Sequence, residues 1–184
     1  KKYSDGIIAL SACLAGDISQ ALMDRNYEKA KNIALQYRDI FGEGNFYLEI
    51  QDHGLPEQKE VNAALVKLSK EINIPLVATN DIHYVNKEDS KIHDVLMCIQ
   101  MGKTVNDPNR MRFGSDEFYL KSREEMEELF PYAPEAIDNT VKIAEMCNIE
   151  FDFNTIHLPK YDVPEGYTPD TYLRELCFKG LEER

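Results

Sequence analysis

The sequence lacks both a Cys-x-x-Cys pair and any long apolar run. Its four cysteines, Cys13, Cys98, Cys147 and Cys177, are scattered, with no Cys-x-x-Cys pair. This pattern argues against a disulfide framework and predicts reduced thiols, most of them in the core. No apolar stretch approaches the roughly 18 residues that cross a bilayer, and no apolar core follows the lysines at the start. We therefore expect a cytoplasmic protein with no membrane contact and no signal peptide.

Positive charge is also scarce. Lysine and arginine total 21 against 33 aspartates and glutamates, which gives a formal net charge of −12. Such a surface repels phosphate backbones, so strong DNA binding by this chain alone is not expected. The length of 184 residues and the hydrophobic content of 43% predict one domain with a short appendage. Because the first residue is lysine and not methionine, we expect a fragment or a processed product.

Strands and helices alternate in the first half of the chain. Apolar runs at 6–11, 45–51 and 74–78 predict three buried strands. Helical spacing of apolar residues at 27–41 and 56–72 predicts a helix between each pair of strands. This order is typical of a parallel α/β sheet or barrel, in which ligands gather at the carboxyl ends of the strands.

Asp81 and His83 follow the third apolar run. If the backbone stays extended from Leu76 to His83, alternate side chains share a face and these two point the same way. A carboxylate oxygen beside an imidazole nitrogen is an arrangement that binds divalent metals. The alternative is a surface strand end with no ligand role.

Two further groups occupy corresponding positions. Cys13 comes just after the first predicted strand, and Glu49 with His53 lies at the end of the second. A free cysteine is most often a small core residue, so that alternative stays open for Cys13. Three potential ligand groups at the ends of successive strands nevertheless favour a metal site at this edge of the sheet.

The second half of the chain is predicted to be mainly helical. Helices are expected at 87–100, 122–130 and 134–147, followed by a linker at 151–166 and a last amphipathic helix at 168–184. His93 and Cys98 are five residues apart on the first of these helices and do not share a face, so both are interpreted as structural.

A loop at 107–114 contains two arginines close to aromatic residues. Arg110 and Arg112 could hold a phosphate or the carboxylate of a partner. A solvated loop is the alternative explanation.

Several segments together resemble one family. They are Phe46–Pro56, Val77–Tyr84, Asp116–Tyr119, Asn139–Cys147 and Phe178–Arg184. In order and over nearly the whole chain, they resemble the bacterial replicative DNA polymerase III alpha-subunit family, in the later part of its amino-terminal PHP (polymerase and histidinol phosphatase) domain. The resemblance implies an α/β fold in which residues 1–155 form part of a distorted (β/α)7 barrel. Residues 156–184 would form a linker and the first helix toward the polymerase palm.

The resemblance also implies a ligand set. Asp81 and His83 match a metal-binding Asp-x-His motif, and Cys13 matches the cysteine of a Ser-x-Cys-Leu-Ala-Gly turn that binds metal. The implied cofactor is a zinc-like or manganese-like divalent metal, and magnesium would serve the polymerase domain, which lies outside this chain. Glu49 and His53 also resemble family residues and are interpreted as supporting or structural. The family's opening His-x-His motif and the palm motif Pro-Asp-x-Asp-x-Asp-Phe are absent from this sequence, so no catalytic residue is assigned and the chain alone is expected to be inactive.

For the parent protein, the resemblance implies a DNA-directed DNA polymerase, a nucleotidyltransferase of DNA replication. In the intact protein the PHP segment would contribute to a metal site with 3′–5′ exonuclease activity. The alternative is a structural and interaction module, without catalysis of its own, that docks a proofreading subunit. A free-standing PHP phosphatase is a third reading, disfavoured by the whole-chain resemblance. Implied partners are other replicase subunits, and DNA reached through the rest of the parent.

Overall fold

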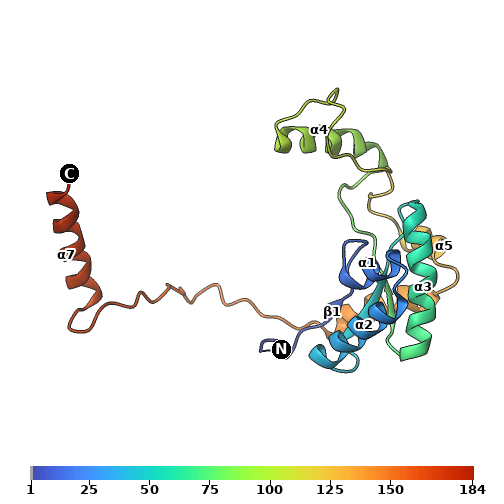
Figure 1. Ribbon diagram of the computed structural model, residues 1–184, viewed down its shortest axis with the longest axis horizontal. Helices are drawn as coiled ribbons and strands as arrows, with labels where there is room; N and C mark the ends of the chain where they lie inside the picture. Colours follow the sequence, from blue (N-terminus) through green and yellow to red (C-terminus); the bar gives the residue numbers. More distant parts are fainter. Residues whose placement is uncertain (1) are drawn as a thin grey trace. The chain divides into compact units, whose positions relative to one another are not determined.

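The computed structural model describes residues 2–184. It divides into two compact units, Lys1–Cys147 and Asn148–Arg184. The elements of the first unit (Figure 1) are β1 (Ala9–Leu10), α1 (Asp17–Met23), α2 (Tyr27–Phe41), β2 (Phe46–Ile50), α3 (Pro56–Ile72), β3 (Leu76–Ala78), a 3-10 turn (Lys87–Asp89), α4 (Ser90–Met101), α5 (Arg123–Leu129) and α6 (Pro134–Met146).

The three strands form one parallel sheet in the order β1-β2-β3. Ala9 pairs with Phe46, and Leu48 pairs with Leu76. Parallel neighbours require a crossover connection; α1 and α2 lie between β1 and β2, and α3 lies between β2 and β3. The predicted α/β alternation is therefore confirmed as a mixed α/β fold with a small parallel sheet.

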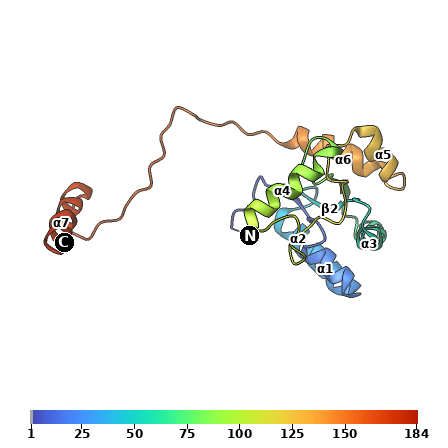
Figure 2. The same ribbon diagram turned by 90° about the horizontal axis from the view of Figure 1, so that it is seen from above.

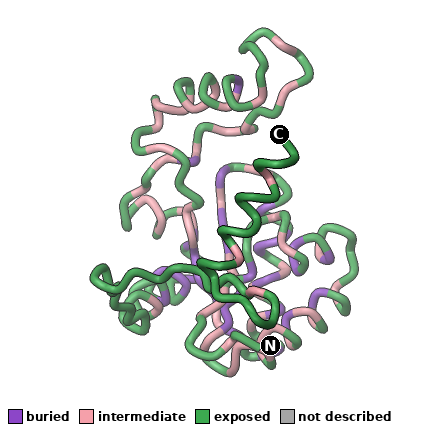
Figure 3. The backbone as a smooth tube through the Cα atoms, turned by 90° about the vertical axis from the view of Figure 1, so that its left-hand side faces the viewer, coloured by how far each residue is buried: buried purple, intermediate pink, exposed green. Residues whose placement is uncertain are grey.

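The central strand β2 forms the middle of the core. Phe46, Leu48 and Ile50 alternate along it and belong to one apolar cluster with residues of α1, α2, α3 and α6. On α3 the predicted stripe is confirmed at Val61, Leu65 and Leu68. Figure 3 shows how burial concentrates along the strands and the helices that cover them.

Helix ends follow the predicted signals. Pro56 occupies the first turn of α3, and Gly42, at φ 91°, ends α2. Ser122 and Glu125 form a capping box at the start of α5, in which each side chain accepts a hydrogen bond from the other residue's backbone N–H. Figure 2 shows α5 and α6 beside each other, and their residues are in contact.

Several expectations about strands were wrong. The third strand ends at Ala78, and Asp81 has a left-handed backbone (φ 46°), so the segment does not stay extended to His83. The first strand is only two residues long. Ile7 and Leu10 are 46% and 37% exposed, because β1 is an edge strand of the described sheet and has a neighbour on one side only.

Other differences concern burial. Cys98 is the one buried cysteine among the four, so the expectation of mostly core thiols was wrong. Within the predicted helix 134–147, which ends at Met146 in the structure, Ile137 is buried, whereas Val141, Ala144 and Cys147 are exposed. The first half of α6 carries the buried residues, including Asn139, whose amide donates to the Leu76 carbonyl at 2.7 Å. The second half therefore extends past the core.

One helix was not predicted. Helix α1 has only seven residues, and its N-cap, Gly16, provides no side-chain hydrogen bond. A short helix without a capping side chain leaves little signal in the sequence.

The second unit is described by itself. It runs without helix or strand through the predicted linker and then forms α7 (Pro169–Glu182). Thr168 caps this helix, and its side chain accepts a hydrogen bond from the Thr171 N–H at 3.3 Å. No residue of α7 is buried. In the part of the chain that the structure describes, no helix has both the length and the apolarity needed to traverse a bilayer.

Candidate functional site

The carboxyl ends of the three parallel strands meet at one edge of the sheet, where Glu49 joins them. Its Oε2 accepts a hydrogen bond from the backbone N–H of Ala12, after β1, at 3.0 Å. Its Oε1 accepts from the hydroxyl of Thr79, after β3, and from the amide of Gln51 at 3.0 Å. The backbone N–H of Glu49 donates to the Ser11 hydroxyl at 2.8 Å. One carboxylate thus ties together the segments that follow all three strands.

Cys13 lies on the tight turn that follows β1. Ala12 has a left-handed backbone (φ 64°), and the Gly16 N–H closes the turn on the Cys13 carbonyl at 2.9 Å. A Cβ on Gly16 would lie 2.4 Å from the Ser11 carbonyl oxygen, so the turn accepts only glycine there without moving. The Cys13 side chain is exposed and lines a small pocket together with Glu49.

Asp81 and His83 lie together despite the break in the strand. The carboxylate Oδ1 is 3.4 Å from the imidazole Nε2. Two ligand atoms at about 2.1 Å from a tetrahedral metal are separated by about 3.4 Å, so this spacing suits shared coordination of one divalent cation. The His83 backbone is fixed by its N–H, which donates to the Phe118 carbonyl at 2.8 Å.

Aromatic rings surround the His83 imidazole. The ring centroids of Phe113, His93 and Phe118 lie 4.8, 5.4 and 5.5 Å from that of His83. His93, whose helical position predicts a structural role, thus lies close to His83, which that position does not predict. The only available signal was its position on the first helix after the Asp-x-His motif.

His53 supports this edge without being free to bind metal. Its Nε2 lies 2.8 Å from the Asn80 carbonyl oxygen, which only accepts, so Nε2 carries the proton. Its Nδ1 accepts from the Gln58 amide at 2.8 Å, and the ring stacks on Phe118 at 3.9 Å. Both nitrogens are engaged. Burial is the main cause that lowers the pKa of His53 below its ordinary value of 6.5.

Buried His53 predicts a loss of stability in mild acid. Because the folded state holds this ring neutral, its contribution is fully present above about pH 6.5 and is lost as the pH falls toward the lowered pKa of the folded state. The free energy of unfolding, measured by urea denaturation, should therefore fall between pH 7.5 and pH 5.5. A His53→Gln variant should be less stable at pH 7.5 and show a shallower decline. An equal slope in both proteins would contradict the prediction.

The predicted ligands, Asp81, His83 and Cys13, fit part of the coordination shell of a divalent metal. Asp81 and His83 converge, and Cys13 lies separately beside Glu49. Within residues 2–184, no group of three or more histidine, cysteine, aspartate or glutamate side chains is placed to hold an ion. Since protein metal sites use three or more ligands, these residues alone do not complete one.

The arginines of the 107–114 loop differ in their partners. Arg110, whose side chain is 2% exposed, makes a two-pronged ion pair with Asp94 of α4, with Nη2 to Oδ2 at 2.6 Å. Arg110 is therefore paired within the chain. It is neither a solvated loop residue nor free to bind an external anion. Arg112 donates instead to the Val105 carbonyl at 3.0 Å.

Residues 1–53 match the PHP domain family. This stretch contains β1, the turn with Cys13, and β2 with Glu49. Over these 53 residues, and in its parallel α/β architecture, the chain is similar to the class of proteins that contain a PHP domain.

Along its whole length the chain is similar to proteins named DNA polymerase III subunit alpha. It is 44% identical over 184 residues to that of Treponema pallidum and 45% identical over 186 residues to that of Borreliella burgdorferi. The subunit of Thermus aquaticus is 44% identical over 190 residues. Each comparison covers 100% of this chain, which spans 16% of the relative's length. The resemblance predicted from the sequence, to DNA polymerase III subunit alpha with a PHP domain, is confirmed.

Proposed function

We propose that this chain is the later part of the PHP domain of a bacterial replicative DNA polymerase alpha subunit. Residues 1–155 would complete a distorted (β/α)7 barrel with residues outside this chain, and residues 156–184 would lead toward the polymerase palm. The parent protein would act in DNA replication in the cytoplasm, with other replicase subunits as partners. The similarity to the alpha subunits over the full chain supports this assignment.

The proposed role of the segment is to supply ligands to a divalent-metal site of a 3′–5′ exonuclease. The observation that carries this role is the 3.4 Å separation of Asp81 Oδ1 and His83 Nε2 at the carboxyl edge of a parallel sheet. Asp81 would provide an anionic oxygen, His83 an imidazole nitrogen and Cys13 a sulfur. A divalent metal bound there would supply Lewis-acid chemistry, lowering the pKa of water and neutralising phosphoryl oxygens.

The residues around these ligands would hold them in place. Glu49 fixes the turn that carries Cys13 and the segment that leads to Asp81. His53 restrains the Asn80 carbonyl, one residue before Asp81. Such outer contacts orient metal ligands and affect metal affinity strongly.

The second candidate function is a structural and interaction module without catalysis. The hydrogen-bonded closure of this edge by Glu49 and His53 favours it, because protein groups alone tie the three strand ends together. The net charge of −12 also suits docking of protein more than binding of DNA.

The test uses the purified full-length protein, with bound metal measured by mass spectrometry and exonuclease rate measured on single-stranded DNA. Asp81→Asn and His83→Ala should each lower metal content and exonuclease rate at least tenfold, while leaving polymerase rate unchanged. Asp162→Asn and His157→Ala, at exposed positions of the second unit, are the matched controls.

Unchanged metal content and exonuclease rate in both ligand variants would refute the catalytic role. The structural module would be favoured if the variants had a lower melting temperature and weaker subunit binding, and if the wild-type protein itself showed no exonuclease activity.

A further inference from the structure

A second pocket lies next to the Asp81–His83 pair and plays no part in holding the proposed metal. It has a volume of about 360 Å³ and lies between α4 and the segment that follows it. His93 and Phe113 line it, and both rings also contact His83. Its size falls within the roughly 300–1,000 Å³ of small-molecule sites.

The carboxylates of this pocket already have cationic partners. Asp94 is paired with Arg110, which lies outside the lining. Asp116 lies 3.7 Å from the ammonium of Lys87, which is also outside it and pairs more closely with Glu117, and Glu117 pairs with Lys121 as well. Asp94 thus has its own cationic partner, and Asp116 belongs to a network of two carboxylates and two ammonium groups.

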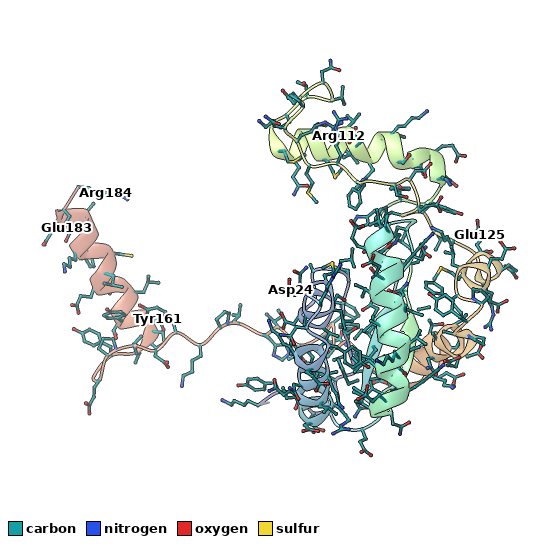
Figure 4. The ribbon with its side chains drawn as sticks, turned by 45° about the vertical axis from the view of Figure 1, so that its right-hand side comes forward. Asp24, Arg112, Glu125, Tyr161, Glu183 and Arg184 are labelled. Atoms are coloured by element: carbon teal, nitrogen blue, oxygen red, sulfur yellow. The ribbon has the colours of Figure 1, made fainter. Side chains whose placement is uncertain are left out.

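The cations of the lining, in contrast, are not neutralised. Lys91 and Arg112 take part in none of the ion pairs formed within residues 2–184. The Arg112 guanidinium donates only to backbone carbonyls, those of Val105 and Asp107. Figure 4 labels Arg112 on the segment beside α4. The lining holds two cations and two carboxylates, and because both carboxylates have cationic partners outside it, Lys91 and Arg112 are the lining charges left to attract an anion.

The pocket also offers aromatic surface. The His93 and Phe113 centroids are 5.1 Å apart with ring planes at 59°, and Tyr84 lies 5.5 Å from His93 on another side. Rings in such a cluster provide faces and edges on which a nucleobase can stack. An anion that also carries a flat aromatic group matches both properties.

We infer that this pocket binds one nucleoside monophosphate unit, with its phosphate toward Lys91 and Arg112 and its base against Phe113 and His93. The inference deepens the proposed exonuclease function and rests on it in one respect: the unit bound there would be the terminal nucleotide of the strand presented to Asp81 and His83. The pocket supplies the substrate class that the metal ligands alone do not specify.

The test measures binding of deoxyadenosine monophosphate to the full-length protein by calorimetry, in EDTA. Lys91→Gln should weaken the Kd about tenfold through loss of a charge-assisted hydrogen bond, and Lys91→Arg should restore it. Phe113→Leu keeps an apolar side chain and should also weaken the Kd about tenfold through loss of stacking. Lys29→Gln, at an exposed lysine of α2, is the matched control and should leave the Kd unchanged.

Inorganic phosphate should bind at least tenfold more weakly than the nucleotide. If a single-stranded oligonucleotide displaces the nucleotide, the natural ligand of the pocket is the end of a strand. If it does not, the natural ligand is a free nucleotide. Equal affinity for phosphate and nucleotide would overturn the inference, as would an unchanged Kd in both Lys91→Gln and Phe113→Leu at wild-type melting temperature. Since EDTA removes divalent metal from the assay, a failure of the metal site and a failure of this pocket give separate results.

Discussion

Replacing Phe130 by alanine is expected to lower the free energy of unfolding by about 3–5 kcal/mol. Phe130 follows α5, is 1% exposed and belongs to the main apolar cluster with Ala133 and Ala136. Its truncation removes a large buried side chain and leaves a cavity that a close-packed core cannot fill. Urea denaturation of the 184-residue chain would measure the loss.

The matched control is Phe153→Ala. Phe153 lies in the second unit and is 89% exposed, so its removal should change the free energy of unfolding by no more than about 0.5 kcal/mol. Equal effects of the two substitutions would show that the segment from α5 to α6 is not packed as described.

Replacing Gly16 by alanine is expected to cost about 1–3 kcal/mol and to distort the turn that carries Cys13. The added Cβ would approach the Ser11 carbonyl oxygen to 2.4 Å and the Cys13 carbonyl oxygen to 3.2 Å. Both are backbone atoms of the same turn, so the strain cannot be relieved by rotating a side chain. The readouts are urea denaturation and the rate at which a thiol reagent modifies Cys13.

Gly180→Ala provides the opposite control. Gly180 lies within α7, and a Cβ there meets no atom within 4 Å. Alanine should therefore stabilise that helix by about 0.5–1 kcal/mol, because glycine loses more backbone freedom on folding. A Gly16→Ala protein as stable as the wild type, with Cys13 equally reactive, would contradict the described turn.

Local signals predicted much of the fold. The apolar stripe of α3, the proline in its first turn and the Ser122–Glu125 capping box depend on residues close in sequence, and each is present. The left-handed backbone of Asp81 could not be predicted, because aspartate adopts it only when surrounding structure compensates the cost.

In the candidate site, too, features that depend on nearby residues could be predicted, and features that depend on long-range contacts could not. The meeting of strand ends followed from the strand and helix order, since parallel strands bring their carboxyl ends to one edge. The approach of His93 and Phe113 to His83 depends on long-range pairing, in which the Tyr84 backbone forms a bridge with Tyr119. Helical periodicity contains no information about that pairing, so His93 was interpreted as structural.

Glu49 gives this edge of the sheet a mechanical property. Because its two oxygens serve different segments, one before Cys13 and one before Asp81, neither segment can move without straining or releasing a hydrogen bond to the shared carboxylate. A displacement of Thr79 would therefore strain the same carboxylate that accepts from the Ala12 N–H. We expect the two segments to be mechanically coupled through this one side chain.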